Sequence, residues 1–73
     1  MVFTKGMKVM VKPRAWLMKS KTNIHFASRM KRYCGRTITL TSDLERDNGF
    51  VYYIAEDWSW DPEWLMPLEM ENE

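Results

Sequence analysis

The sequence predicts one small domain that is mostly β with a single short helix, and three observations lead to this expectation. Threonine alternates with apolar residues over residues 37–41, which is the period of a half-buried strand. Asp47-Asn48-Gly49 indicates a hairpin turn, because asparagine and glycine tolerate a positive φ. The 73 residues form one domain, whose core must come from four Trp, three Tyr, three Phe and seven Met.

Residues 7–12 are expected to form the first strand. Val9 and Val11 fall on the side that faces the core, because side chains alternate along a strand. Pro13 ends the strand, since proline has no N–H for the sheet ladder. The outward positions are Lys8, Met10 and Lys12.

Residues 14–23 have no clean period and are rich in Lys and Ser, so a long loop is expected. Two outcomes are considered for its large apolar residues. In one, Trp16 and Leu17 turn inward as a plug. In the other, Trp16 is exposed and contacts a partner.

A short helix of two to three turns is expected from Ile24 onward. Three apolar residues recur at the i, i+4 and i+7 spacing of one helical face. Gly35 suits the C-terminal end, and Asn23 or His25 is expected to cap the start. The three residues of the helical face are Phe26, Met30 and Tyr33.

The clearest strand pattern covers residues 36–42, with Ile38 and Leu40 on the core side. Residues 50–55 are expected to return as its partner. Asp57 then permits a tight turn into a very short strand, in which Trp58 and Trp60 share one face and are expected in the core; the alternative is that they form, with Trp64, an exposed aromatic groove for a peptide. One side of the returning strand holds Phe50, Tyr52 and Ile54.

A 3₁₀ turn is expected next, with Asp61 as N-cap and Pro62 at the first helical position. Pro67 limits this segment to a single turn. Residues 68–70 are expected to form the closing strand, and residues 71–73 a polar tail.

Five short strands, a long first loop and a 3₁₀ turn before the last strand are typical of an SH3-like barrel, whose closure removes exposed strand edges. The helix inserted before the second strand is the variation. We therefore expect an all-β fold with one short helix: a single SH3-like five-stranded barrel domain over residues 1–73.

Three runs carry a resemblance: Met30-Lys31-Arg32-Tyr33-Cys34-Gly35-Arg36-Thr37-Ile38-Thr39-Leu40, Tyr52-Tyr53-Ile54-Ala55-Glu56-Asp57-Trp58-Ser59-Trp60 and Glu63-Trp64-Leu65-Met66-Pro67. Their combined order resembles a family of small SH3-like proteins encoded by bacteriophages and prophages of Gram-positive bacteria, most of which have no assigned function. The resemblance covers residues 24–68. It implies the barrel fold and a mobile-element origin, and it implies no reaction.

The chain departs from that family's pattern in two places. Met66 stands where an acidic residue is common, and the loop over residues 14–23 is basic and carries Trp16. Both departures put apolar or cationic groups near the rim of the expected barrel, where they would be available to a partner.

Charge is divided unevenly along the chain. Residues 1–42 hold ten Lys and Arg and no acid, whereas residues 43–73 hold ten acids and a single arginine. One interpretation is a basic face for an anionic partner. The other is internal pairing, in which Lys8 and Lys12 of the first strand lie opposite Glu69 and Glu71 of the last.

No pattern of catalytic or metal-binding residues is present in the sequence. His25 is the only histidine, and a capping or packing role is expected for it. Cys34 is the only cysteine, so it forms no internal disulfide and is expected to be a buried structural thiol. The acidic pairs Glu56-Asp57 and Asp61/Glu63 lack the dense ligand spacing of a calcium loop. We therefore expect no enzyme activity, no cofactor and no metal.

The sequence also bears on location. No apolar run approaches the roughly 18 residues of a membrane span, and lysines interrupt the apolar runs of the N-terminus, so no secretory signal is expected. Together with the free thiol, this predicts a protein of the bacterial host's cytoplasm with no membrane partner.

Two functions are considered. The first is a non-catalytic phage or prophage protein that engages a host or phage protein, for example as an inhibitor of a bacterial defence system such as an anti-CRISPR. The second is nucleic-acid binding through the basic half. The expected partner-binding residues are Arg14, Trp16, Lys19, Lys21, Arg29, Lys31, Arg32, Tyr53 and Met66.

Overall fold

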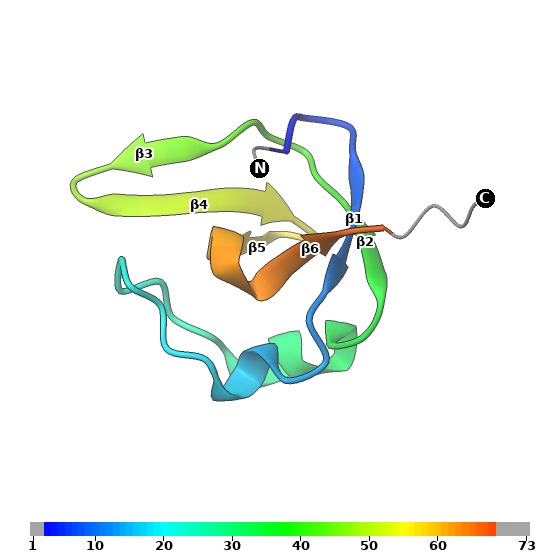
Figure 1. Ribbon diagram of the computed structural model, residues 1–73. Helices are drawn as coiled ribbons and strands as arrows, with labels where there is room; N and C mark the ends of the chain where they lie inside the picture. The colour runs from blue at the N-terminus through cyan, green and yellow to red at the C-terminus, as the bar shows by residue number, and fades with distance from the viewer. Residues whose placement is uncertain (1–2, 69–73) are drawn as a thin grey trace.

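The computed structural model describes residues 3–68 as two three-stranded antiparallel sheets joined by short turns (Figure 1). The first sheet has the order β2-β1-β6, and the second has the order β3-β4-β5. The strands are β1 (Lys8–Val11), β2 (Thr37–Thr39), β3 (Glu45–Asp47), β4 (Phe50–Ala55), β5 (Trp58–Trp60) and β6 (Leu65–Pro67). Three 3₁₀ helices complete the fold: η1 (Ala15–Leu17), η2 (Ser28–Tyr33) and η3 (Pro62–Trp64).

Strand β1 forms the middle of its sheet and confirms the alternation expected for it. Val9 and Val11 are fully buried, whereas Lys8 is exposed. In the register, Val9 lies opposite Ile38 of β2 on one side and opposite Pro67 of β6 on the other. The first and last strands are therefore neighbours.

The hairpin at Asn48 and Gly49 forms as predicted, but it joins a strand that the sequence pattern missed. Both residues have positive φ, 49° and 87°, as a type I′ turn requires. Through this turn β4 pairs with β3, whose three residues are all exposed, and not with the strand expected over residues 36–42. The strand expected over residues 36–42 forms only as β2, which ends at Thr39. Beyond this end, the Thr41 N–H donates to the Ile54 carbonyl at 2.8 Å.

The core-facing side of β4 is not the one that holds Phe50, Tyr52 and Ile54. Tyr53 and Ala55 are buried, whereas Phe50 is exposed. Tyr53 was expected at a partner contact, and this expectation is wrong. Its hydroxyl accepts from the Phe3 N–H at 2.9 Å and donates to the Phe3 carbonyl at 3.2 Å, so the buried phenol holds down the start of the described chain.

The helical segment is shorter and tighter than predicted. It begins at Ser28, after an extended stretch, so neither Asn23 nor His25 caps it. Because a 3₁₀ helix has about three residues per turn, Met30 and Tyr33 lie one above the other on the side that packs against the core. Phe26 also packs against the core, although it precedes the helix.

The 3₁₀ turn before the last strand is confirmed at η3. The carboxylate of Asp61 accepts from the Glu63 N–H at 2.7 Å, and Pro62 is the first helical residue. Strand β6 starts directly afterwards, three residues earlier than predicted. Of the predicted closing strand, residues 69 and 70 lie outside the described residues, as do Glu69 and Glu71, the partners considered for Lys8 and Lys12.

Four aromatic rings pack together, with Trp60 and Trp64 in the core and Phe26 and Tyr33 partly buried against it. Trp60 meets Phe26 and Tyr33 edge to face, at 6.1 and 5.9 Å between ring centroids, and Phe26 meets Trp64 at 5.0 Å. The Trp60 indole donates to the Ala55 carbonyl at 3.0 Å, so its buried N–H has a partner. The core position predicted for Trp60 is confirmed. The other predicted core tryptophan, Trp58, is half-buried, and so is Cys34.

Candidate binding surfaces

The predicted partner-binding cations do not form one patch. All six of them are exposed, but they come from two segments and meet different neighbours. Tyr53 is in the core, as described above, and Met66 is half-buried on β6. The six exposed cations are Arg14, Lys19, Lys21, Arg29, Lys31 and Arg32.

The three-residue period of η2 separates its cations. Met30 is buried against the core. Arg29 and Arg32, spaced by three residues, share a second side of the helix, and both line the same surface hollow. Lys31 faces a third direction, where its Nζ lies 4.8 Å from the centroid of the Trp16 ring. A six-residue helix thus directs its cations to two different surfaces.

The first candidate surface, the Trp16–Leu17 surface, is apolar and lies on η1. Trp16 is 45% exposed and Leu17 is 59% exposed, so the inward plug considered for them is wrong and the exposed position of Trp16 is confirmed. Ala15 is the residue of η1 that enters the core, and the next two positions of the tight turn therefore point outward. Lys31 covers one side of the indole, in a cation–π contact.

The loop after η1 is held against η3, and one of the predicted cations, Lys21, takes part in these contacts. The Trp64 indole donates to the Met18 carbonyl at 3.0 Å, and the Ser20 hydroxyl donates to the buried carboxylate of Asp61. Lys21 pairs with Glu63 at 3.6 Å, in an exposed ion pair that contributes little to stability. This loop, with Trp64, lines a shallow hollow of about 390 Å³.

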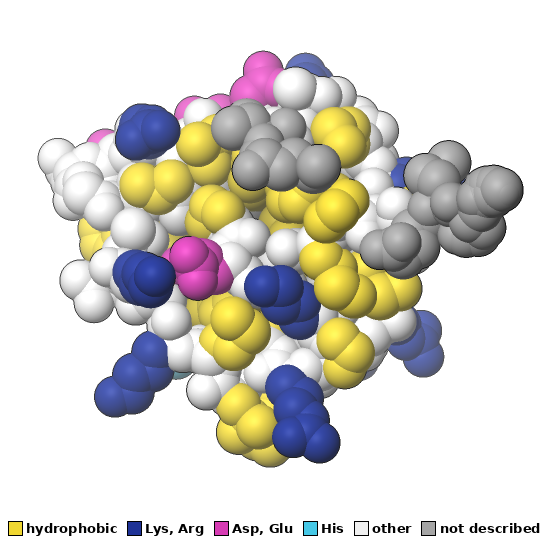
Figure 2. Space-filling model, in the orientation of Figure 1, with side chains coloured by type: hydrophobic (Ala, Val, Ile, Leu, Met, Phe, Trp, Pro, Cys, Tyr) yellow, Lys and Arg dark blue, Asp and Glu magenta, His cyan; other side chains and the backbone are white. Residues whose placement is uncertain are grey.

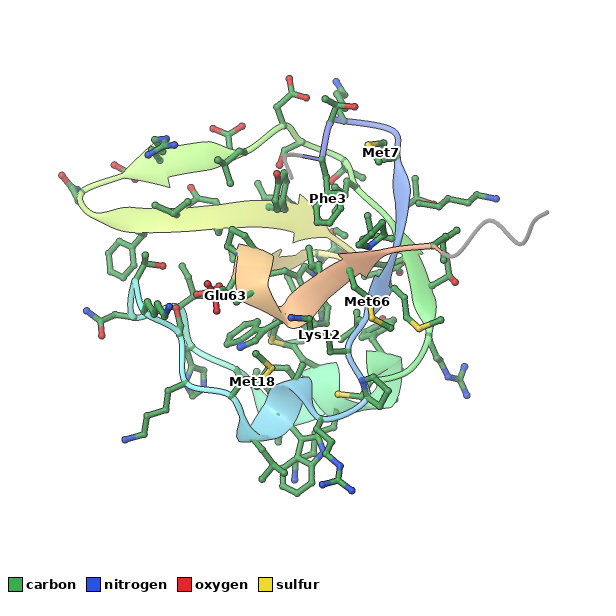
Figure 3. All side chains as sticks on the ribbon, in the orientation of Figure 1. Phe3, Met7, Lys12, Met18, Glu63 and Met66 are labelled. Carbon is green, nitrogen blue, oxygen red and sulfur yellow. The ribbon has the colours of Figure 1, made fainter. Side chains whose placement is uncertain are left out.

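Met66 lies on the outer side of the β2-β1-β6 sheet. It is directly opposite Met10 in the register, and Lys12 follows on the same side of β1. Figure 3 shows Met66 and Lys12 next to each other on this face, with Met18 below them. In the space-filling view of the same orientation, hydrophobic and basic side chains are interspersed there, one acidic side chain lies between two basic ones left of the centre, and further acidic side chains lie along the upper edge (Figure 2).

The second candidate surface surrounds Trp58 and was not predicted. Two hollows, of about 470 and 450 Å³, share the residues Asp57 and Trp58. The first also includes Arg29 and Arg32, and the second includes Phe50, which is 40% exposed. Together these two hollows are called the Trp58 trench below.

Neither a metal site nor a membrane span is found among the described residues. Residues 3–68 contain no cluster of three or more His, Cys, Asp or Glu side chains that would hold a metal ion. His25 is exposed, and no helix in the described part of the chain has the length and apolar character to cross a membrane.

Comparison with known proteins gives no match. The chain matches no family model, and no curated protein and no solved structure is significantly similar to it. The two surfaces therefore have to be interpreted from their own chemistry.

Proposed function

We propose that this protein is a non-catalytic binding module that recognises another protein through the Trp16–Leu17 surface. The observation that carries the proposal is the exposure of Trp16 and Leu17 side by side. Tryptophan is enriched among the residues that dominate binding energy at protein interfaces. A chain of 73 residues needs its large side chains for the core, and two on the surface require a reason.

We propose an SH3-like barrel as the scaffold for this surface. The strand orders β2-β1-β6 and β3-β4-β5, with η3 before the last strand, support it. So does the bend at residues 40–44, which carries the chain from β2 of one sheet to β3 of the other. The bond between Thr41 and Ile54 lies at this junction of the two sheets.

The chemistry of the surface favours a partner with an acidic rim and an apolar pocket. Arg14 stands two residues before Trp16 in the chain, and Lys31 lies on the Trp16 ring, so the proposed surface combines cations with apolar residues. Leu17 is the most exposed large apolar residue described, so an apolar pocket on the partner would remove more of its surface from water than that of any other such residue. The narrower version of the proposal is a host partner in the bacterial cytoplasm, such as a component of a defence system that an anti-CRISPR would inhibit.

Affinity capture from a lysate of a Gram-positive host tests the proposal. We expect the wild-type protein to retain a stoichiometric protein partner and the W16A/L17A double variant to lose it. The matched control is F50A, which removes a similarly exposed aromatic ring from the other candidate surface. Capture of no stoichiometric protein by the wild type, or equal capture by W16A/L17A, contradicts the proposal.

The second candidate function is nucleic-acid binding, which the contact between Lys31 and the exposed Trp16 ring favours. The separation of Arg29 and Arg32 from this contact weakens the case for a long continuous basic surface. Titration of labelled single- and double-stranded DNA and RNA at increasing salt decides it. Binding through Trp16 predicts a salt-sensitive complex that W16A weakens, and an absence of binding at low salt excludes this function.

A further inference from the structure

The two hollows of the Trp58 trench differ in chemistry and share a border at Asp57 and Trp58. Arg29 and Arg32 line one end. Asp57 and Trp58 belong to both hollows and therefore mark the middle. Phe50 and Ile24 line the other end. One hollow is thus cationic, the other is aromatic and aliphatic, and a carboxylate and an indole belong to both.

The cationic end is a pair of arginines held in register. Residues spaced by three in a 3₁₀ helix lie one above the other, so the guanidinium groups of Arg29 and Arg32 emerge from the same side of η2. The ion pair Lys21–Glu63 is the only one among residues 3–68, so neither arginine has a carboxylate within ion-pair distance there. Paired planar guanidinium groups suit bidentate contacts with phosphate oxygens.

The middle of the trench is a turn with an unusual sequence. Glu56 and Asp57 both have positive φ, 52° and 65°, where the other hairpin of this chain has asparagine and glycine. Aspartate tolerates this conformation, but glutamate is poorly suited to it, so the turn itself does not explain Glu56. A carboxylate at this position can accept hydrogen bonds from the hydroxyls of a ribose, as acidic residues do in dinucleotide sites.

The apolar end presents an aromatic ring to solvent. Phe50 is 40% exposed although it starts a strand of the second sheet, and Trp58 beside it is only half-buried. Exposed aromatic faces provide stacking platforms for nucleobases, whichever base is present. A packing role does not account for this exposure of Phe50.

We propose that the Trp58 trench binds a 5′-nucleotide unit. The phosphate lies against Arg29 and Arg32, the ribose hydroxyls donate to Asp57, and the base stacks at the end lined by Phe50 and Trp58. The order phosphate, ribose, base matches the order of cations, carboxylate and aromatic rings along the trench. Each hollow is within the usual range of small-molecule sites, roughly 300–1,000 Å³. This site is separate from the protein-binding surface proposed for Trp16 and Leu17.

One residue of the trench disfavours binding of this ligand, so its substitution is expected to raise the affinity for the nucleotide. Glu56 lines the same hollow as the two arginines and repels a phosphate dianion. Its removal must therefore strengthen binding, whereas removal of Asp57, its neighbour in the turn, must weaken it. If the two substitutions acted only by disrupting the turn, both would change the affinity for the nucleotide in the same direction.

The probe is adenosine 5′-monophosphate, titrated into the full 73-residue chain and followed by amide chemical shifts. We expect saturable shifts at Phe50, Asp57 and Trp58, with adenosine and ribose 5-phosphate each binding at least about tenfold more weakly. Equal affinity for ribose 5-phosphate, or no shifts at these three residues at millimolar nucleotide, overturns the proposal. An adenylate hexamer distinguishes the two sources of the unit: tighter binding than the monophosphate indicates single-stranded RNA, and weaker binding indicates a free nucleotide.

Three variants divide the site, with one control outside it. R29Q/R32Q is expected to weaken binding of the monophosphate by about tenfold or more. D57N, which keeps a residue that tolerates positive φ, is expected to weaken binding by about tenfold for the ribonucleotide and not for its 2′,3′-dideoxy analogue. E56Q is expected to bind about two- to fivefold tighter. The control R14Q/K31Q removes two exposed cations that do not line the trench, and an effect of it equal to that of R29Q/R32Q overturns the proposal.

Discussion

The two hairpin turns of the second sheet have the same backbone geometry but very different sequences. Asn48 and Gly49 join β3 to β4, whereas Glu56 and Asp57 join β4 to β5, and all four residues have positive φ. The first pair is the one that a type I′ turn prefers. The second pair includes a glutamate in a conformation that long side chains rarely adopt. The first turn has the residues that folding requires, and the second has residues that its conformation alone does not favour.

The largest effect on the free energy of unfolding is expected at the turn between β3 and β4, where the residues suit the backbone conformation. Gly49→Val places a β-branched side chain at φ 87°, and we expect it to lower the free energy of unfolding by about 2–3 kcal/mol. No atom lies within 4 Å of the added Cβ, so this loss comes from the backbone conformation and not from a clash. Urea denaturation measures it. Gly49→Asn is the control, because asparagine tolerates positive φ, and an equal loss for both variants would contradict this explanation.

An intermediate effect of opposite sign is expected at the other turn. Replacing Glu56 and Asp57 by asparagine and glycine supplies the residues that a type I′ turn prefers, and we expect the free energy of unfolding to rise by about 1 kcal/mol. The same denaturation experiment measures this gain. A loss of stability would show that the two carboxylates contribute to folding, and the contrast between the turns would then disappear.

The smallest effect is expected for Asp57→Asn. Both residues tolerate the left-handed conformation, so the free energy of unfolding should change by less than about 0.5 kcal/mol, even though the carboxylate is lost. Thermal unfolding followed by circular dichroism is sufficient to detect a larger change. A loss above about 1 kcal/mol would give Asp57 a structural role in the turn.

The sequence predicted those parts of the fold in which one period dominates. Val9 and Val11 alternate with polar or less buried neighbours, and Asp61 with Pro62 carries a local start signal for a 3₁₀ helix, so both segments form as expected. The inward side of β4 could not be predicted from Phe50–Ala55, because all six residues are apolar or aromatic and no alternation distinguishes the two sides. Burial of Tyr53 depends on its hydrogen bonds to Phe3, which is 50 residues away in the chain.

The candidate sites were predicted only in part, for a related reason. Trp16 and the cations were recognisable by residue type. The position of Arg29 and Arg32 on the same side of η2, however, depends on the 3₁₀ period of that helix, whereas the sequence predicted an α-helical spacing. Leu17 was considered only as a plug. Glu56 and Asp57 give no sequence signal for a tight turn as strong as Asn48-Gly49, so the trench became visible only with the φ angles and the shared hollows.

A paired measurement on one variant tests most directly the claim that the carboxylates of the second turn are not required for folding and that Asp57 contributes to ligand binding. Urea denaturation and titration with adenosine 5′-monophosphate are carried out on the same preparation of E56N/D57G and of the wild type. We predict a higher free energy of unfolding together with a weaker nucleotide affinity in the variant. Lower stability, or unchanged affinity for the nucleotide, would contradict the claim.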